Sequence, residues 1–209
     1  MKPAALLIAL ATAVPAAAQT DRFTLRPYGM ITEQAFSAQT TFDAVFGQAA
    51  YPFWGAGAEL MLPHHIYVDV SASRFKKTGQ RAFLGANGQI LQLNIPLTAT
   101  LTPFEITGGY RFQLRRRRKL TPFVGAGIGW YAYKETSSFS VAGEDVDLTH
   151  IGELVVGGVE FRVHRWISLS VDAQYTHIPG ILGTGGISKE AAETDLGGIA
   201  GRFKFIVGR

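Results

Sequence analysis

Four side chains between positions 168 and 177 are of the types that a serine hydrolase uses. Ser168 and Ser170 are candidate nucleophiles, Asp172 a candidate orienting carboxylate and His177 a candidate base. Nucleophilic catalysis requires the base within hydrogen-bond reach of the hydroxyl. In a strand the two serines and Asp172 share one face, whereas His177 lies on the other. The spacing therefore argues against catalysis, and we expect no enzyme activity.

Candidate cofactor and metal sites are equally weak. Gly125, Gly127 and Gly129 lie inside an apolar, strand-like segment, whereas a nucleotide-binding loop needs a tight turn that leads into a helix. His64 and His65 are adjacent and would point to opposite faces of a strand, which makes a poor chelate. The chain has no cysteine, so disulfides and thiolate sites are excluded. We expect neither a cofactor nor a metal ion.

These residues lie in segments where apolar and polar side chains alternate with a period of two. Ile167, Leu169 and Val171, for example, alternate with Ser168 and Ser170. Such alternation is typical of a strand with one apolar and one polar face. The pattern predicts eight strands, at residues 23–37, 51–62, 66–75, 94–113, 121–135, 149–163, 166–177 and 195–208.

The first residues form a different kind of segment. Lys2, an apolar run over residues 4–14 and the small residues 16–18 match a secretory signal peptide that is cleaved after Ala18. The run is too short to cross a bilayer as a helix, which needs about 20 apolar residues. We therefore predict a signal peptide at residues 1–18 and a single domain at residues 19–209.

The predicted connections alternate between short and long. Those near residues 63–65, 115–119 and 164–165 are short, and those at 38–50, 76–93, 136–148 and 178–194 are long and polar or glycine-rich. Short periplasmic turns and long outer loops are typical of transmembrane barrels, whose strands must close into a ring because lipid offers no hydrogen-bond partner to a sheet edge. The sequence thus predicts an all-β fold, an eight-stranded antiparallel up-and-down transmembrane β-barrel. Whether Phe36, Phe42 and Phe46 form an additional element near the first long loop stays open.

Charged residues within the strands predict a polar lumen. Eight strands enclose a space just wide enough for side chains to fill, and an arginine on the lipid face would cost about 2 to 4 kcal/mol at the midplane. We expect glycines at 55, 57, 125, 127 and 129 to face inward and make room for the long charged chains. Paired charges are expected to join Glu160 to Arg111 and Asp172 to Arg202. The predicted lumen network comprises Glu105, Arg111, Glu160, Arg162, Asp172, Arg202 and Lys204.

Aromatic residues near the strand ends predict two girdles at the membrane interfaces, where amphipathic rings are enriched. Those at the short-turn end are Tyr110, Phe112, Trp166, Phe203 and Phe205. Those at the long-loop end are Trp54, Trp130, Tyr131, Tyr133 and Tyr175.

Basic residues are concentrated in two places. The run at residues 115–119 lies at a short turn and is interpreted as snorkelling toward lipid phosphates, not as a nucleic-acid site. Lys76, Lys77 and Arg81 lie in a predicted outer loop, from which they could reach lipopolysaccharide phosphates. The expected partners are outer-membrane lipid, lipopolysaccharide and the outer-membrane assembly machinery, with no nucleic acid, and the protein is expected to be a monomer.

Several segments resemble the family of small outer-membrane β-barrels typified by OmpA and OmpW. The similarity lies in residues 122–130 (PFVGAGIGW), 157–163 (GGVEFRV), 168–175 and 203–205 (FKF). It covers essentially the whole chain after residue 18. The resemblance implies the barrel architecture and an outer-membrane location in a Gram-negative cell envelope, and it leaves the function open.

Two functions are compatible with such a barrel. The first is a non-catalytic anchor with a structural or surface-interaction role in the cell envelope. The alternative is a narrow, porin-like passive channel for small or apolar molecules. They differ in the lumen, because paired charges would block flow whereas unpaired charges with space between them would permit it. A soluble barrel that binds an apolar ligand would need its apolar face inside, which the charged inner face argues against.

Overall fold

The computed structural model describes residues 23–84, 89–114, 119–137, 146–183 and 186–208. Eight antiparallel strands form one closed barrel in which each strand pairs with its neighbours in sequence and β1 pairs with β8. The strands are β1 (Thr24–Phe36), β2 (Ala50–Met61), β3 (Ile66–Leu84), β4 (Ile90–Arg111), β5 (Leu120–Ser137), β6 (Val146–His164), β7 (Ile167–His177) and β8 (Gly198–Val207). The predicted fold class is confirmed.

The period-two pattern of the sequence decides which side chains enter the barrel. In β1, β7 and β8, buried and exposed residues alternate almost without interruption. The apolar residues face outward, and Val171, Ile199 and Val155 are more than half exposed on the outer wall. The polar set of β7, which runs from Ser168 to Thr176, is buried inside. A barrel that is apolar outside and polar inside reverses the usual arrangement of a soluble fold.

The wall of the barrel is much taller on one side than on the other. Pairing between β2 and β3 ends at Trp54 with Arg74, yet β3 continues to Leu84, about 30 Å of further strand at about 3.3 Å per residue. Pairing between β6 and β7 likewise begins only at Glu153 with His177, although β6 begins at Val146. Strands β3 to β6 therefore project as a four-stranded sheet beyond the rim formed by the other four.

This projecting sheet corrects the predicted loop at residues 76–93. The chain pairs as a β-hairpin almost to its tip, from Lys76 with Thr100 to Leu84 with Ile90, with a register shift between Gln80 and Ala82. The prediction was wrong because residues 76–81 are polar on both faces and Ile90 and Leu91 are apolar on both, so the segment lacks the period-two alternation that marks a strand. The hairpin is nevertheless held by the β3–β4 backbone ladder.

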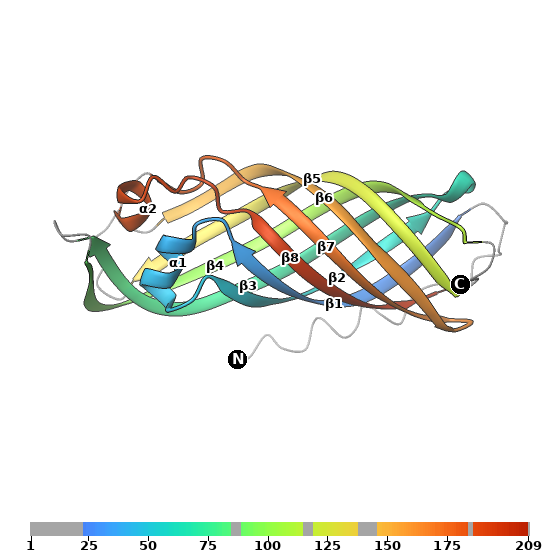
Figure 1. The fold of residues 1–209 in the computed structure, drawn as a ribbon, viewed down its shortest axis with the longest axis horizontal. Helices are drawn as coiled ribbons and strands as arrows, with labels where there is room; N and C mark the ends of the chain where they lie inside the picture. The colour runs from blue at the N-terminus through green and yellow to red at the C-terminus, as the bar shows by residue number, and fades with distance from the viewer. Residues whose placement is uncertain (1–22, 85–88, 115–118, 138–145, 184–185, 209) are drawn as a thin grey trace, which may run out of the picture.

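Two helices lie at the end of the barrel from which the sheet projects, beside the rim formed by β7, β8, β1 and β2 (Figure 1). They are α1 (Gln39–Phe46), which lies in the first long connection, and α2 (Gly186–Glu190), which lies in the last. The question left open by Phe36, Phe42 and Phe46 is thereby answered, because the latter two residues belong to α1. Among the described residues, no helix is long and apolar enough to span a membrane.

Candidate functional site

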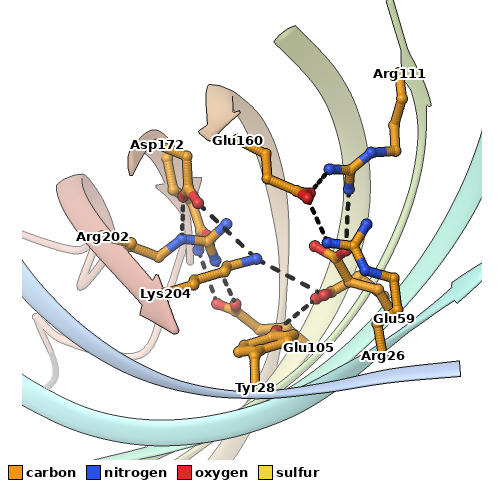
Figure 2. A network of polar contacts seen from close by, with 11 residues as sticks. Arg26, Tyr28, Glu59, Glu105, Arg111, Glu160, Asp172, Arg202 and Lys204 are labelled. Carbon is orange, nitrogen blue, oxygen red and sulfur yellow. Dashed lines mark hydrogen bonds and ion pairs between the residues drawn. The ribbon is translucent and has the colours of Figure 1, made fainter. Parts of the chain in front are cut away.

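Four charged side chains from four strands form a closed cluster in the barrel interior. Arg26 of β1 donates to Glu160 of β6 at 2.6 Å, and Arg111 of β4 donates to Glu59 of β2 at 2.9 Å. Arg111 also pairs with Glu160, and Arg26 lies 3.8 Å from Glu59. Two cations and two anions therefore alternate around a ring (Figure 2). All four side chains are buried.

A second cluster lies beside the first and is centred on β8. Arg202 Nε lies 2.5 Å from Asp172 Oδ1, and its Nη1 lies 3.7 Å from Glu105 Oε2. Lys204 Nζ lies 3.7 Å from an oxygen of Asp69 and 3.9 Å from one of Asp172. The ammonium also lies 4.5 Å from the ring centre of Tyr28, whose hydroxyl donates to Asp69 at 2.9 Å. Figure 2 shows Arg202 and Lys204 between Asp172 and Tyr28.

Neutral side chains extend this second cluster toward the rim. Gln174 Nε2 and the hydroxyl of Tyr131 both donate to Glu105 Oε1 at 2.9 Å. Gln174 also accepts a hydrogen bond from Arg202. Buried charges are tolerated only when they are paired and hydrogen-bonded, and removal of one partner typically costs about 3 to 5 kcal/mol. The interior polar residues are therefore strongly interdependent.

The structure places six of the seven predicted network residues in these two clusters: Glu105, Arg111, Glu160, Asp172, Arg202 and Lys204. The prediction was wrong for Arg162, which is exposed. Arg162 has the inward parity of Glu160 but lies at the end of β6, beside the register shift between Arg162 and His164. At the rim its guanidinium reaches water instead of the lumen.

Three interior charges were missing from the predicted network. They are Asp69, Arg26 and Glu59, and all three are buried. Arg26 and Glu59 are direct cross-strand partners in the β1–β2 register. Their strands obscured the pattern, because the inward face of β1 includes the apolar Met30 and the outward face of β2 is rich in small residues. Two opposite charges that face the same side of neighbouring strands, as Arg26 and Glu59 do, were the signal that would have identified them.

The predicted aromatic residues separate by parity. Eight of them are exposed on the outer wall: Trp54, Tyr110, Phe112, Trp130, Trp166, Tyr175, Phe203 and Phe205. Tyr131 and Tyr133 are buried inside the barrel, so their assignment to a girdle was wrong. Neighbouring residues of a strand point to opposite faces, and Trp130 therefore excludes Tyr131 from the outer wall.

Three of the five glycines predicted to face inward lie against tyrosine side chains and not, as predicted, against the charged chains. A Cβ on Gly57 would lie 2.4 Å from the Tyr28 hydroxyl, and one on Gly125 would lie 2.5 Å from the Tyr67 hydroxyl. Gly129 is covered by the ring of Tyr131 in the same way, at 2.8 Å. These glycines are needed because an aromatic ring rests directly on the backbone.

The half of the interior nearer the long connections, which we call the outer half, is apolar. The rings of Phe36 and Phe42 stack at 3.9 Å, and Phe75 packs edge-on against Phe36. Ile178 and Leu196, from the last long connection, are fully buried in the same cluster. We call this cluster the apolar plug, comprising Phe36, Ala38, Phe42, Tyr51, Phe53, Phe75, Ala99, Leu101, Tyr131, Tyr133, Ile178, Ile181, Leu182 and Leu196.

Two carboxylates fasten the loops that form the plug. Glu193 accepts hydrogen bonds from the backbone N–H groups of Thr40 and Thr41, both at 2.8 Å, and so caps the first turn of α1 from a distant loop. Partial burial opposes ionisation of Glu193, but the hydrogen bonds from Thr41 and Thr40 outweigh it and hold its pKa below the ordinary value. Asp195 accepts from the N–H groups of Ile178 and Gly197, which similarly lower its pKa against the effect of burial.

The serine constellation does not assemble. Ser168, Ser170 and Asp172 are buried in the lumen, whereas His177 is exposed and its Nδ1 lies 3.0 Å from Asp195. Gly125, Gly127 and Gly129 lie within β5 and not in a loop. Within the described residues, no group of three or more potential ligands is arranged to hold a metal ion.

The comparisons with known proteins agree with this architecture. The family described as "Outer membrane protein beta-barrel domain" matches residues 4–197. This chain belongs to that family. It is therefore an outer-membrane β-barrel with transmembrane strands, and the small barrels of the family are generally non-catalytic. The predicted signal peptide at residues 1–18 lies outside the described residues and stays a prediction.

Solved structures of small barrels are similar to this barrel in fold. Neisserial surface protein A is 14% identical, with a TM-score of 0.50 and coverage of 89% of this chain and 95% of that chain. Ail of Yersinia pestis, solved with a heparin analogue, is 9% identical, with a TM-score of 0.48 over 90% and 96% of the two chains. The N-terminal barrel domain of Pseudomonas aeruginosa OprF is 9% identical, with a TM-score of 0.47 over 88% and 97%. No curated protein sequence matches this chain.

Proposed function

We propose that this barrel is a closed, non-catalytic outer-membrane anchor that presents the projecting sheet of β3 to β6 for contacts at the cell surface. The observation that carries the proposal is the doubly filled interior. Ion-paired charges occupy the part of the lumen crossed by Arg26 and Arg202, and the apolar plug occupies the outer half. Water could cross the barrel only if both the ion-paired clusters and the apolar plug opened.

The projecting sheet supports a surface role. In transmembrane barrels the long connections are extracellular and the short turns periplasmic. By that rule the β3–β4 hairpin extends away from the outer leaflet. Ile90, Leu91 and Leu93 are exposed on this hairpin. Exposed apolar side chains on an extended sheet provide contact area that a barrel wall inside lipid cannot provide.

A planar-bilayer conductance measurement tests the closed interior. We expect the purified protein to show no discrete current steps once it is shown to be folded. Folding is checked by a different migration of boiled and unboiled samples on a detergent gel. The double variant Phe42→Ala/Glu160→Ala, which weakens both fillings, should admit ions, whereas Asp147→Ala on the outer face should not. Regular conductance of the unmodified protein would contradict the anchor and favour a narrow passive channel.

The orientation is tested separately by cysteine labelling, for which the natural chain has no background because it lacks cysteine. Gln80→Cys lies on the projecting hairpin and Arg165→Cys at a short turn, and both native side chains are exposed. We expect a membrane-impermeant maleimide to label the first variant on intact cells and the second only after permeabilisation. The reverse pattern would remove the projecting sheet from the cell surface.

A further inference from the structure

The outward face of the projecting sheet is basic near the rim of the barrel. Residues 70–104, which cover most of β3 and β4, contain four lysine or arginine residues and no aspartate or glutamate. Two of the four, Arg74 and Lys76, flank Phe75, which is buried inside the barrel. Both therefore point to the outer wall, where they are exposed. Within the described part of the chain, neither of these two cations forms an ion pair.

Strand register brings a third cation to the same face. Lys76 of β3 pairs with Thr100 of β4, which in turn pairs with Lys134 of β5. Neighbouring strands lie about 4.8 Å apart, so the backbones at the two lysines are about 10 Å apart with one threonine between them. Arg74 lies about 7 Å from Lys76 along β3, and the three long side chains can therefore reach one shared anion. We call Arg74, Lys76, Thr100 and Lys134 the basic face.

Two carboxylates border the basic face. Asp147 of β6 is the cross-strand neighbour of Lys134, and its carboxylate lies 3.1 Å from the ammonium. An exposed pair of this kind is weak, and a lysine ammonium has three donors, so Lys134 can bind a second anion. Glu33 lies on the other side, on β1, two strands away from β3. The surface around Arg74 and Lys76 is thus free of anions between these two borders.

The basic face begins where the lipid-facing wall ends. The exposed rings of Phe104 and Trp130 lie 5.9 Å apart on neighbouring strands, and Phe104 pairs with Ala72. Arg74 and Lys76 lie about 7 and 13 Å beyond Ala72 along β3, on the side of the projecting sheet. Outward aromatic rings of a membrane barrel mark the boundary between hydrocarbon and headgroups. The cations therefore lie at the level of the lipid headgroups.

We propose that the basic face binds a phosphate group on the headgroup of lipopolysaccharide in the outer leaflet. Lysine and arginine bind phosphate by charge-assisted hydrogen bonds. The hydroxyls of Thr78 and Thr98 lie 2.8 Å apart in the next row outward and can bond to sugar hydroxyls. Below the cations, the outward side chains of Ile106 and Ile128 continue the apolar wall along which acyl chains lie. A lipid uses both parts of this surface, whereas a soluble anion would use the cations alone.

Native mass spectrometry of the detergent-purified barrel tests this site. The probes are diphosphorylated lipid A and the same lipid A after enzymatic removal of both phosphates. Arg74→Gln/Lys76→Gln removes two cations of the basic face. Lys77→Gln/Arg165→Gln is the matched control, because it removes the same charge elsewhere. The ammonium of Lys77 lies 5.3 Å from the ring centre of the inward Tyr51, and Arg165 lies at a short turn.

We expect the natural protein and the control to bind the phosphorylated lipid A equally and to prefer it to the dephosphorylated form. The site variant should bind the phosphorylated form about 30-fold more weakly, since each cation near a charged lipid surface contributes about fivefold. Its binding of the dephosphorylated form should be unchanged. Different migration of boiled and unboiled samples shows that each variant is folded. If the double variant does not fold, Lys76→Gln replaces it, with an expected loss of about fivefold.

Three results would overturn the lipid site. One is an equal loss of binding in the control, because net charge alone would then explain it. Another is a natural protein that does not distinguish the two lipids. The third is tighter binding of heparin than of phosphorylated lipid A by the natural protein, lost in the site variant, because the face would then belong to a soluble polysaccharide.

The lipid site requires the long connections to face outward, as the proposed function does. Cysteine labelling of Gln80→Cys tests that orientation separately. Outside labelling together with equal lipid binding by all variants would overturn the lipid site and leave the surface role intact. Conductance of the natural protein would overturn the closed lumen and leave the lipid site intact.

Discussion

The two halves of the barrel interior are filled by opposite means. Around Arg26 and Arg202 the filling consists of charges donated by the strands themselves, held in place by the closed sheet. In the outer half it consists of apolar side chains, several of which come from α1 and the last long connection. The charged side chains can separate only if the sheet itself unfolds. Part of the apolar half, in contrast, can move out of the barrel with α1 and the last long connection while the sheet stays intact.

Loss of one interior carboxylate should have the largest effect. Glu160→Ala leaves Arg26 and Arg111 without one of their two shared partners, and we expect the free energy of unfolding to fall by about 3 to 5 kcal/mol. Urea titration of the barrel in lipid vesicles measures this change. A loss below about 1 kcal/mol, the range of an exposed pair, would show that water already screens the cluster and that the two halves are not distinct in kind.

Truncation of a plug side chain should lower the free energy of global unfolding by less than loss of Glu160 does. Its main effect should be local opening of α1. Phe42→Ala removes the ring that stacks on Phe36, and such truncations cost about 3 to 5 kcal/mol in a core that cannot open. Because α1 can open without breaking the ladder, we expect a smaller change in global unfolding and faster amide exchange over residues 39–46. Equal losses for Phe42→Ala and Glu160→Ala would remove the distinction between the halves.

The cap on α1 should weaken in acid. A carboxyl whose folded pKa is lowered contributes stability above its unfolded pKa, and the contribution disappears as the pH falls through the folded pKa, which for Glu193 lies below its ordinary value. Glu193→Gln should cost about 1 kcal/mol, as the loss of a helix cap does, and should remove this pH dependence. Chemical shifts of the Thr40 and Thr41 amide groups between pH 6 and pH 3 measure it. A titration that persists in Glu193→Gln would assign it to another group.

An exposed ion pair should have the smallest effect. Lys134 and Asp147 lie 3.1 Å apart on the projecting sheet, and both side chains are more than half exposed. We expect Asp147→Ala to change the free energy of unfolding by less than about 1 kcal/mol in the same urea titration, and less in high salt. A loss comparable to that of Glu160→Ala would mean that burial does not explain the strength of the interior clusters.

The sequence by itself determined the features that depend on strand parity and on turn length. Alternation assigned Asp172, Arg202 and Lys204 to the lumen and Val171 and Phe203 to the outer wall, because successive side chains of a strand point to opposite faces. Short and long connections then predicted the closed antiparallel order, since an open edge is not tolerated in lipid.

The sequence predicted the pairs Glu160–Arg111 and Asp172–Arg202, and both form. Only the tertiary structure decided the other contacts between interior residues. Arg26 and Glu160 are 134 positions apart, and their contact follows from the register and curvature of the closed barrel and not from any local pattern. Tyr131 entered the lumen against the girdle prediction because parity outweighed its aromatic type, and Gly129 left space for its ring. The plug was hidden for the same reason: Phe36, Phe42 and Phe53 meet Ile178, Ile181 and Leu196 only when β1 closes on β8.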